Sequence, residues 1–207
     1  MDKLNVRNII KYVAIGSCLL TSSHLWGAFN FDAQLFDAAK SGNVNGVHEA
    51  ARQGANVNAP DRYGRTPLHY AVREGRLDAI VALFERGANV NVVDTVGWTP
   101  LRYAVIYKKQ WAIPLLIAKG ADVNIWDNRV GTLLHVIAGN VTSGVAADNN
   151  RADVVRMLIR LGINVNALNR NNQTALDIAR QGGTDAAKEI ASLLRTYGAK
   201  TSAEIGR

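Results

Sequence analysis

The phrase "GANVN" occupies residues 54–58 and recurs at 87–91, and the close variants "GADVN" and "GINVN" follow at 120–124 and 162–166. Their leading glycines are separated by 33, 33 and 42 residues. Such regular spacing is typical of repeat proteins, in which each unit is one supersecondary structure that buries its apolar face against its neighbours. The sequence therefore predicts a row of similar units.

Each interval between two copies of the phrase predicts two short helices. Thr66–Pro67 is expected to begin the first, because the hydroxyl can cap free backbone N–H groups and proline at the first helical position loses no needed donor. Gly75 is expected to end this helix, and Gly87 suits a left-handed cap after the second. The apolar stripe of the second helix is assigned to Ile80, Val81, Leu83 and Phe84.

After each helix pair, an Asn-Val-Asn stretch and an Asp-x-x-Gly turn lead to the next unit. In this order of elements the chain resembles the ankyrin repeat, a β-turn with two antiparallel helices per 33 residues. The resemblance covers residues 33–199 and implies an all-α repeat solenoid of stacked helix-turn-helix units with β-turn fingers. Five repeats are expected at 33–64, 65–97, 98–130, 131–172 and 173–199, followed by a C-terminal tail at 200–207.

The fourth unit departs from this pattern. It carries nine extra residues within 139–152, where small and polar residues predict a surface loop. The loop is either a tolerated insertion, since longer loops cost little extra entropy, or a contact for a partner. Val130 and Asn172 stand where Gly64 and Gly97 complete the turns of other units, and Gly131 is expected to take the conformation that Val130 resists.

Residues 1–28 have the layout of a secretory signal peptide: a basic start, an apolar stretch at 12–20, then small and polar residues. The apolar stretch is too short for a comfortable membrane span, which needs about 20 such residues. We therefore expect export to a periplasm or to the outside of the cell, with the cut site left open. An uncleaved membrane anchor is the alternative. Cys18, the single cysteine, lies within this segment.

The remaining sequence offers little for catalysis. The net charge of +7 contains no basic run, which favours attraction to acidic partners over binding of nucleic acid. His69 and His135 occupy equivalent places, and the ankyrin resemblance implies that both tie loop to helix; Arg102 stands there in the third unit. His48 is expected to be solvated or partly buried. We predict no catalytic, metal-binding or cofactor-binding residue, and therefore no enzyme.

The resemblance also implies where a protein partner would bind, at the turns and the ends of the first helices. Carried over to this sequence, the candidate partner-binding residues are Arg62, Tyr63, Val96, Trp98, Ile106, Tyr107, Trp126 and Arg129. Neighbouring contact positions are Arg65, Arg73, Glu74, Val93, Thr95, Asn128, Leu168, Arg170, Asn171 and Gln173. Many of these side chains are apolar where surface turns are usually polar, which indicates either an interface or packing of the side chains on one another or on the inserted loop. Trp111 and Phe84 are expected in the core.

The sequence thus predicts an exported, monomeric, non-enzymatic module that binds another protein through its concave face. An accessory or chaperone-like subunit of an envelope enzyme is the main alternative. An enzyme with an unrecognised cleft would need titrating groups with perturbed pKa values. A nucleic-acid-binding protein would show a steep salt dependence.

Overall fold

The computed structural model describes residues 30–127, 129–139 and 151–206. The chain divides into two units, Met1–Asn30 and Phe31–Arg207, and the fold described below is that of the second. The predicted signal peptide lies outside the described residues.

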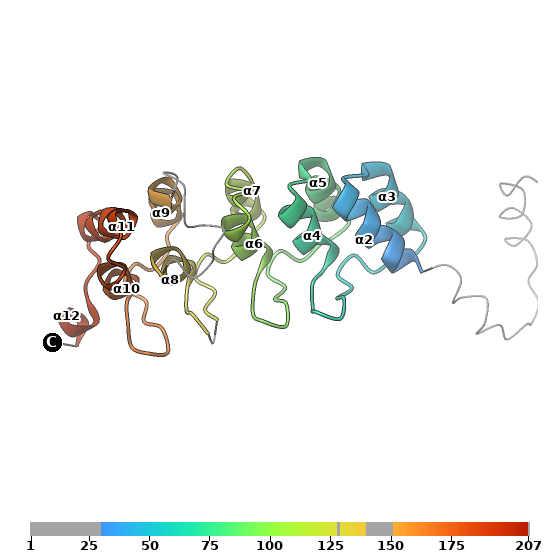
Figure 1. Ribbon diagram of the computed structural model, residues 1–207. Helices are drawn as coiled ribbons and strands as arrows, with labels where there is room; N and C mark the ends of the chain where they lie inside the picture. The colour runs from blue at the N-terminus through green and yellow to red at the C-terminus, as the bar shows by residue number, and fades with distance from the viewer. Residues whose placement is uncertain (1–29, 128, 140–150, 207) are drawn as a thin grey trace, which may run out of the picture. The chain divides into compact units, whose positions relative to one another are not determined.

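Helices are the main elements of this second unit, and they come in pairs. Their bounds are α2 Phe31–Ser41, α3 Val44–Arg52, α4 Pro67–Glu74, α5 Leu77–Glu85, α6 Pro100–Ile106, α7 Ala112–Ala118, α8 Leu133–Ala138, α9 Arg151–Arg160, α10 Ala175–Gln181, α11 Asp185–Thr196 and α12 Ser202–Ile205. Figure 1 shows the five pairs, α2/α3 to α10/α11, in chain order. First helices contact first helices (α2 with α4, α4 with α6) and second helices contact second helices (α3 with α5, α9 with α11). The predicted all-α repeat solenoid is confirmed.

The first helix of most units begins at a threonine with a reciprocal cap. At α4, the Thr66 side chain accepts a hydrogen bond from the backbone of His69, whose own side chain bonds back to the Thr66 N–H. The same capping box joins Thr132 to His135 and Thr174 to Asp177. Each box satisfies two of the helix N–H groups that have no partner inside the helix. The predicted starts at Thr-Pro are therefore confirmed.

The recurring glycine ends the second helix of each unit. Gly87 and Gly120 have φ of 83° and 86°, in the left-handed region that glycine enters without steric cost. The next N–H then reaches back into the last helical turn, from Ala88 to the Leu83 carbonyl at 3.0 Å and from Ala121 to the Leu116 carbonyl at 2.9 Å. This bond is the mark of a Schellman cap.

The last asparagine of the phrase links one repeat to the next. The Asn58 side chain accepts from the Asn89 N–H at 2.7 Å and donates to the Gly87 carbonyl at 3.1 Å. Asn91 does the same with Asp122 and Gly120, both at 2.9 Å. The phrase recurs because each copy supplies both a helix stop and an inter-repeat clamp.

The core follows the same register. One leucine at the same place in each first helix is almost inaccessible: Leu35, Leu68, Leu101, Leu134 and Leu176. Helices α5, α7, α9 and α11 each carry a buried leucine four residues before the cap glycine. These are Leu83, Leu116, Leu158 and Leu194, all at 0% exposure. Burial of each such side chain contributes about 1.5–3 kcal/mol. The pairs thus build one continuous apolar interior.

Two assignments of apolar residues need correction. Val81 is 39% exposed, because α5 buries the face that carries Ile80 and Leu83, whereas Phe84 is half-buried and packs against the core. Trp111 is 44% exposed, since it is the N-cap residue of α7 and stands outside the helix face that packs on the core.

The fourth unit accommodates its unusual turn as predicted. Gly131 has a φ of 103° and forms a single antiparallel bridge with Asp127, while Asn172 takes a φ of 55° at its own turn. Residues 140–150 of the expected loop lie outside the described residues. Arg151 and Ala152, assigned to that loop, instead open α9 and are buried; the Arg151 guanidinium donates to the Ile137 carbonyl. Helix α9 therefore begins earlier than the sequence pattern indicated.

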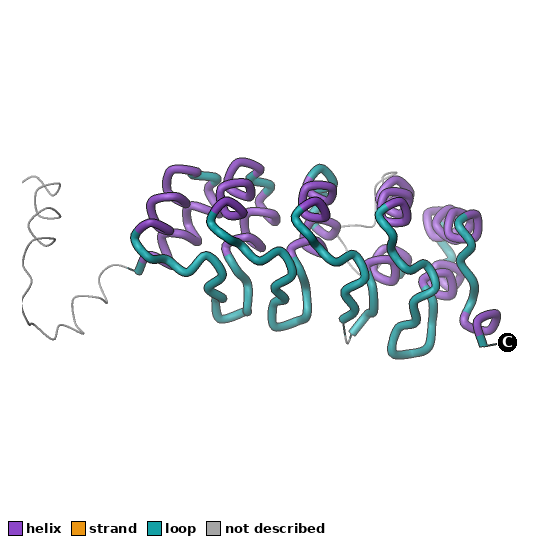
Figure 2. The backbone as a smooth tube through the Cα atoms, turned by 180° about the vertical axis from the view of Figure 1, so that it is seen from behind, coloured by secondary structure: helices purple, strands orange, loops and turns teal. Residues whose placement is uncertain are grey.

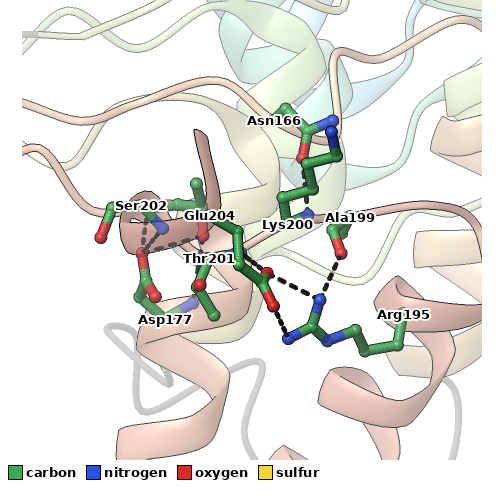
Figure 3. A network of polar contacts seen from close by, with 9 residues as sticks. Asn166, Asp177, Arg195, Ala199, Lys200, Thr201, Ser202 and Glu204 are labelled. Atoms are coloured by element: carbon green, nitrogen blue, oxygen red, sulfur yellow. Dashed lines mark hydrogen bonds and ion pairs between the residues drawn. The ribbon is translucent and has the colours of Figure 1, made fainter. Parts of the chain in front are cut away.

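The C-terminal residues 200–207 include the first turn of a further unit (Figure 3). Thr201 and Glu204 form a capping box at α12, like the box of Thr66 and His69. The Lys200 N–H donates to the Asn166 side chain at 2.7 Å, repeating the inter-repeat clamp. The Ser202 N–H donates to Asp177 at 2.9 Å. This turn covers the polar end of α10.

A surface ion pair holds α12 against α11. The Nη1 and Nη2 atoms of Arg195 each donate to one Glu204 carboxylate oxygen at 2.8 Å. This hydrogen bonding lowers the pKa of Glu204 to about 2. The Arg195 guanidinium also reaches the Ala199 carbonyl.

Candidate interaction surface

The fingers are the turns between consecutive pairs, each numbered by the unit that follows it, and they extend from the helices on one side (Figure 2). In the second finger, one Asp61 oxygen accepts from the N–H groups of Tyr63 and Arg65 at 2.8 and 2.9 Å. Asp94 repeats this arrangement with Val96 and Trp98 at 3.0 and 2.9 Å. These bonds fix the backbone at the finger tips, so the tips are preorganised for binding.

Adjacent fingers are also joined. The Thr95 N–H donates to the Tyr63 carbonyl at 2.9 Å. A Cβ atom at Gly64 would lie 2.9 Å from that same Thr95 nitrogen, so glycine permits the close approach, in addition to its φ of 73°. The second and third fingers therefore present their side chains in a fixed register.

Cations and tyrosines cover the second finger and the neighbouring first helices. We call this group, Lys40, Arg62, Tyr63, Arg65, Tyr70 and Arg73, the arginine–tyrosine patch. The guanidinium carbons of Arg62 and Arg65 lie 4.6 and 4.8 Å from the Tyr63 ring centre. Arg73 and Lys40 lie 4.9 and 4.7 Å from the Tyr70 ring centre. These are cation–π distances, and they order flexible basic side chains on rigid rings.

One carboxylate anchors the patch from below. The Tyr70 hydroxyl donates to Asp61 at 2.6 Å. Burial raises the pKa of the Asp61 carboxyl, but the bonds from Tyr70, Arg65 and Tyr63 outweigh it and leave this pKa below its ordinary value. Asp61 therefore stays ionised, and both of its oxygens already accept hydrogen bonds from within the protein.

The next fingers carry exposed apolar side chains in one repeated place. Val93, Trp126 and Leu168 directly precede the residues that hold their turns, and they are 47%, 44% and 39% exposed. The indole N–H of Trp126 donates to the Leu168 carbonyl at 3.2 Å, which orients the ring along the row. We call Val93, Trp126 and Leu168 the apolar fingertips.

The structure separates the predicted partner-binding residues into two groups. Arg62, Tyr63, Tyr107, Trp126 and Arg129 are exposed. Val96 is half-buried, and Trp98 is half-buried against the Tyr103 ring, with 5.9 Å between the ring centres.

Ile106 is buried, so the expectation that it lies on an exposed surface is wrong. All seven residues of α6 are buried, and the first exposed side chain after it is that of the C-cap, Tyr107.

The two equivalent histidines have the structural role that the resemblance implied. The Nδ1 atom of His69 accepts from the Thr66 N–H, and its Nε2–H donates to the Trp98 carbonyl of the next finger at 3.0 Å. His135 bonds in the same way to Thr132 and to the Gln173 carbonyl. Burial lowers the pKa of both imidazoles below the ordinary 6.5, in keeping with one acceptor and one donor nitrogen.

His48 is partly buried, as predicted. Its Nδ1 atom accepts from Arg86 at 3.0 Å, and its Nε2 atom lies 3.5 Å from Glu85.

Arg102 has a role that the sequence reading missed. It replaces the histidine of the other units and forms a buried ion pair with Asp127 of the next finger. Its guanidinium also lies 4.9 Å from the Trp98 ring centre, and burial lowers the pKa of Arg102 to about 10. The signal was present in the sequence as a charged residue at a histidine position and an aspartate at the base of the following turn.

Across 30–127, 129–139 and 151–206, no three His, Cys, Asp or Glu side chains gather around a point where they could hold a metal ion. A hollow of about 290 Å³ lies at the C-terminal end, lined by Gln173, Asp177, Arg180, Gln181 and Ser202. None of the helices in these residues has the length and apolar character to cross a bilayer.

Comparison with known families agrees with this geometry. A model of three ankyrin repeats matches residues 35–127, and a model of a single ankyrin repeat matches residues 132–170. The chain belongs to the ankyrin-repeat family. Such repeats generally mediate protein–protein interaction, and their domains are typically binding modules without enzymatic activity. The fifth pair, α10 and α11, lies outside both matches, yet it has the same cap, core leucine and clamp. A search of curated proteins finds no match to the chain.

Proposed function

We propose that this chain is an exported, non-enzymatic module that binds a partner protein through its fingers and first helices. The observation that carries the proposal is the exposure of Val93, Trp126 and Leu168 at equivalent places on consecutive fingers. A surface that repeats apolar side chains in fixed register can bury them together against one partner. Because finger backbones are already held by hydrogen bonds, binding loses little conformational entropy there.

The test compares two tryptophans of equal exposure. Trp126 on a finger and Trp111 before α7 are both 44% exposed. Trp126→Ala is expected to weaken capture of the partner from the native compartment by at least about tenfold, in the range of a binding hot spot. Trp111→Ala should leave capture unchanged, and both variants should keep the melting temperature within a few degrees.

Tyr107→Ala extends this test to the first helices. Its side chain is 42% exposed and packs on Tyr103 with 5.5 Å between the ring centres. Capture is expected to fall here as well. Equal capture by wild type, Trp126→Ala and Tyr107→Ala would show that this surface does not carry the interaction.

Export is supported by the sequence of residues 1–28, with its basic start and short apolar stretch. N-terminal sequencing of the chain from cells is expected to find a start near residue 24, 28 or 29, after Ser23, Gly27 or Ala28. A chain that starts at Met1 and sediments with membranes would instead support an uncleaved anchor.

A further inference from the structure

Basic side chains gather on the fingers and first helices. Apart from the buried Arg102, in the described residues they are Lys40, Arg62, Arg65, Arg73, Arg129, Arg170 and Arg180. Arg62, Arg129, Arg170 and Arg180 are exposed, and Lys40, Arg65 and Arg73 are half-buried. They follow the row from α2 to α10, so a ligand lying along the fingers meets positive charge at both ends.

Most carboxylates of the same surface already accept hydrogen bonds from backbone N–H groups. Asp61, Asp94 and Asp127 accept hydrogen bonds from the N–H groups of their own fingers. Asp177 accepts from the N–H groups of Thr174 and Ser202. These acids hold the fold, so their carboxylate oxygens are bound within the protein and are not free to accept hydrogen bonds from a partner.

Three further acids lie on the first helices. Asp32 accepts from the Asn56 N–H, while Asp37 and Glu74 pair with Lys40 and Arg73. Second helices differ, because they carry mixed charges that pair along one helix. Examples are Arg52 with Glu49, Arg156 with Asp153 and Lys188 with Asp185. Among the described finger residues, Arg62, Arg129 and Arg170 are exposed, whereas Asp61, Asp94 and Asp127 are buried or half-buried. The fingers therefore present mainly positive charge to a partner.

Two arginines of the patch contact the same aromatic ring. The guanidinium carbons of Arg62 and Arg65 lie 4.6 and 4.8 Å from the centre of Tyr63. A guanidinium in contact with an aromatic ring can still donate through its N–H groups, in the paired geometry that a carboxylate accepts.

We propose that this surface binds an acidic segment of the partner polypeptide, with apolar side chains beside its carboxylates. The carboxylates pair with the arginine–tyrosine patch, and the apolar side chains cover the apolar fingertips. This inference rests on the proposed protein-binding function and adds the chemistry of the partner. A nucleic acid fits less well, because its phosphates would leave the aliphatic Val93 and Leu168 without contacts.

The proposal is tested with fluorescent peptides of equal length and the full chain. One peptide combines glutamate and leucine, a second replaces leucine with glycine, and a third replaces glutamate with serine. A single-stranded DNA oligonucleotide of the same charge is the fourth probe. The glutamate–leucine peptide is expected to bind at least about tenfold tighter than each other probe, with an affinity that falls as salt rises. Tighter binding of the oligonucleotide, or equal binding of the serine–leucine peptide, would overturn the proposal.

A pair of charge reversals locates the site. Arg62→Glu changes an exposed residue of the patch, and Arg160→Glu changes an exposed residue at the end of α9 by the same charge. Arg62→Glu is expected to weaken binding of the glutamate–leucine peptide about tenfold, and Arg160→Glu less than about twofold. Equal losses would mean that only net charge attracts the peptide, and the proposed site would be wrong.

This outcome is distinct from failure of the proposed function. If Trp126→Ala still abolishes capture of the native partner while no acidic peptide binds, protein binding stands and the acidic partner is excluded. If Trp126→Ala has no effect either, both proposals fail.

Discussion

Two junctions between repeats use different chemistry at the same place. Between the second and third units, neutral His69 caps α4 and donates to the Trp98 carbonyl. Between the third and fourth units, Arg102 replaces the histidine and pairs with Asp127. Thr99 caps α6 through the Arg102 N–H alone, without the reciprocal side-chain bond. The position requires a donor that reaches the next finger, and either an imidazole or an ion pair meets that requirement.

The two solutions differ in what they need from their surroundings. The imidazole satisfies both of its nitrogens with backbone groups. The Arg102–Asp127 pair is buried, so Asp127 depends on Arg102 for compensation, and Arg102 depends on Asp127 together with the nearby negative charge of Asp94. A buried ion pair is costly to desolvate and most costly when one partner is removed.

The largest effect is expected from Asp127→Asn. The amide can still accept the N–H bonds of Arg129 and Val130, but it leaves Arg102 buried without its counter-charge. The free energy of unfolding, measured by urea titration, should fall by about 3–5 kcal/mol.

The fold itself offers a rescue of this variant. His135 and Asn169 occupy the equivalent places at the next junction. Adding Arg102→His to Asp127→Asn should therefore recover most of the loss, with a strongly non-additive double-mutant cycle. Additive losses would show that the pair does not couple the two repeats.

A smaller loss of stability is expected when the pH is lowered. It should distinguish the junctions that use a histidine from the junction that uses Arg102. His69 and His135 have folded-state pKa values below 6.5 because they are buried, whereas the unfolded chain protonates near 6.5. The unfolded state then binds more protons, so stability should fall as the pH drops below about 6.5. Each histidine contributes at most about 1.4 kcal/mol per pH unit. Arg102 stays charged throughout, because its pKa is about 10.

Urea titrations at several pH values between about 7.5 and 5 measure this dependence, within the ordinary range of histidine titration. His69→Gln should make it shallower, and the double variant Arg102→His/Asp127→Asn should make it steeper by adding a third buried imidazole with no carboxylate beside it. An unchanged slope in both variants would contradict the assigned neutral histidines.

The smallest effects are expected from the clamps. Asn91→Ala removes two hydrogen bonds between repeats, both at 2.9 Å, and should cost about 1–2 kcal/mol. Asn124 makes the equivalent bonds to the fourth unit, but its bond to the Gly162 carbonyl is longer, at 3.3 Å. Asn124→Ala should therefore cost less than Asn91→Ala in the same urea titration. The reverse order would show that the inserted unit relies more on its clamp than the regular ones.

The sequence predicted the features that recur in every unit better than the features that differ between units. Gly87, Thr66–Pro67 and the core leucines recur at fixed spacing, and local chemistry alone explains their roles. The burial of Ile106 depends on neighbours in adjacent units, which spacing alone does not specify.

The same reason applies to the ion pair and to the chain end. Arg102 and Asp127 are 25 residues apart, and only the stacked fold brings them together. The turn at α12 is four residues long, too short to give a helical pattern, although Thr201 and Glu204 have capping-box spacing. Of the candidate site, the exposed fingers were predictable, whereas the stacking of arginines on tyrosines required the structure.

The last joint, at residues 198–201, carries the same cap glycine and asparagine clamp as the internal ones. This joint therefore uses the same chemistry as the internal joints. A duplicated gene segment inserted there would encode a unit whose docking groups are already in place. Folding energetics leaves the number of units open, and natural selection can adjust it to the length of whatever the protein binds.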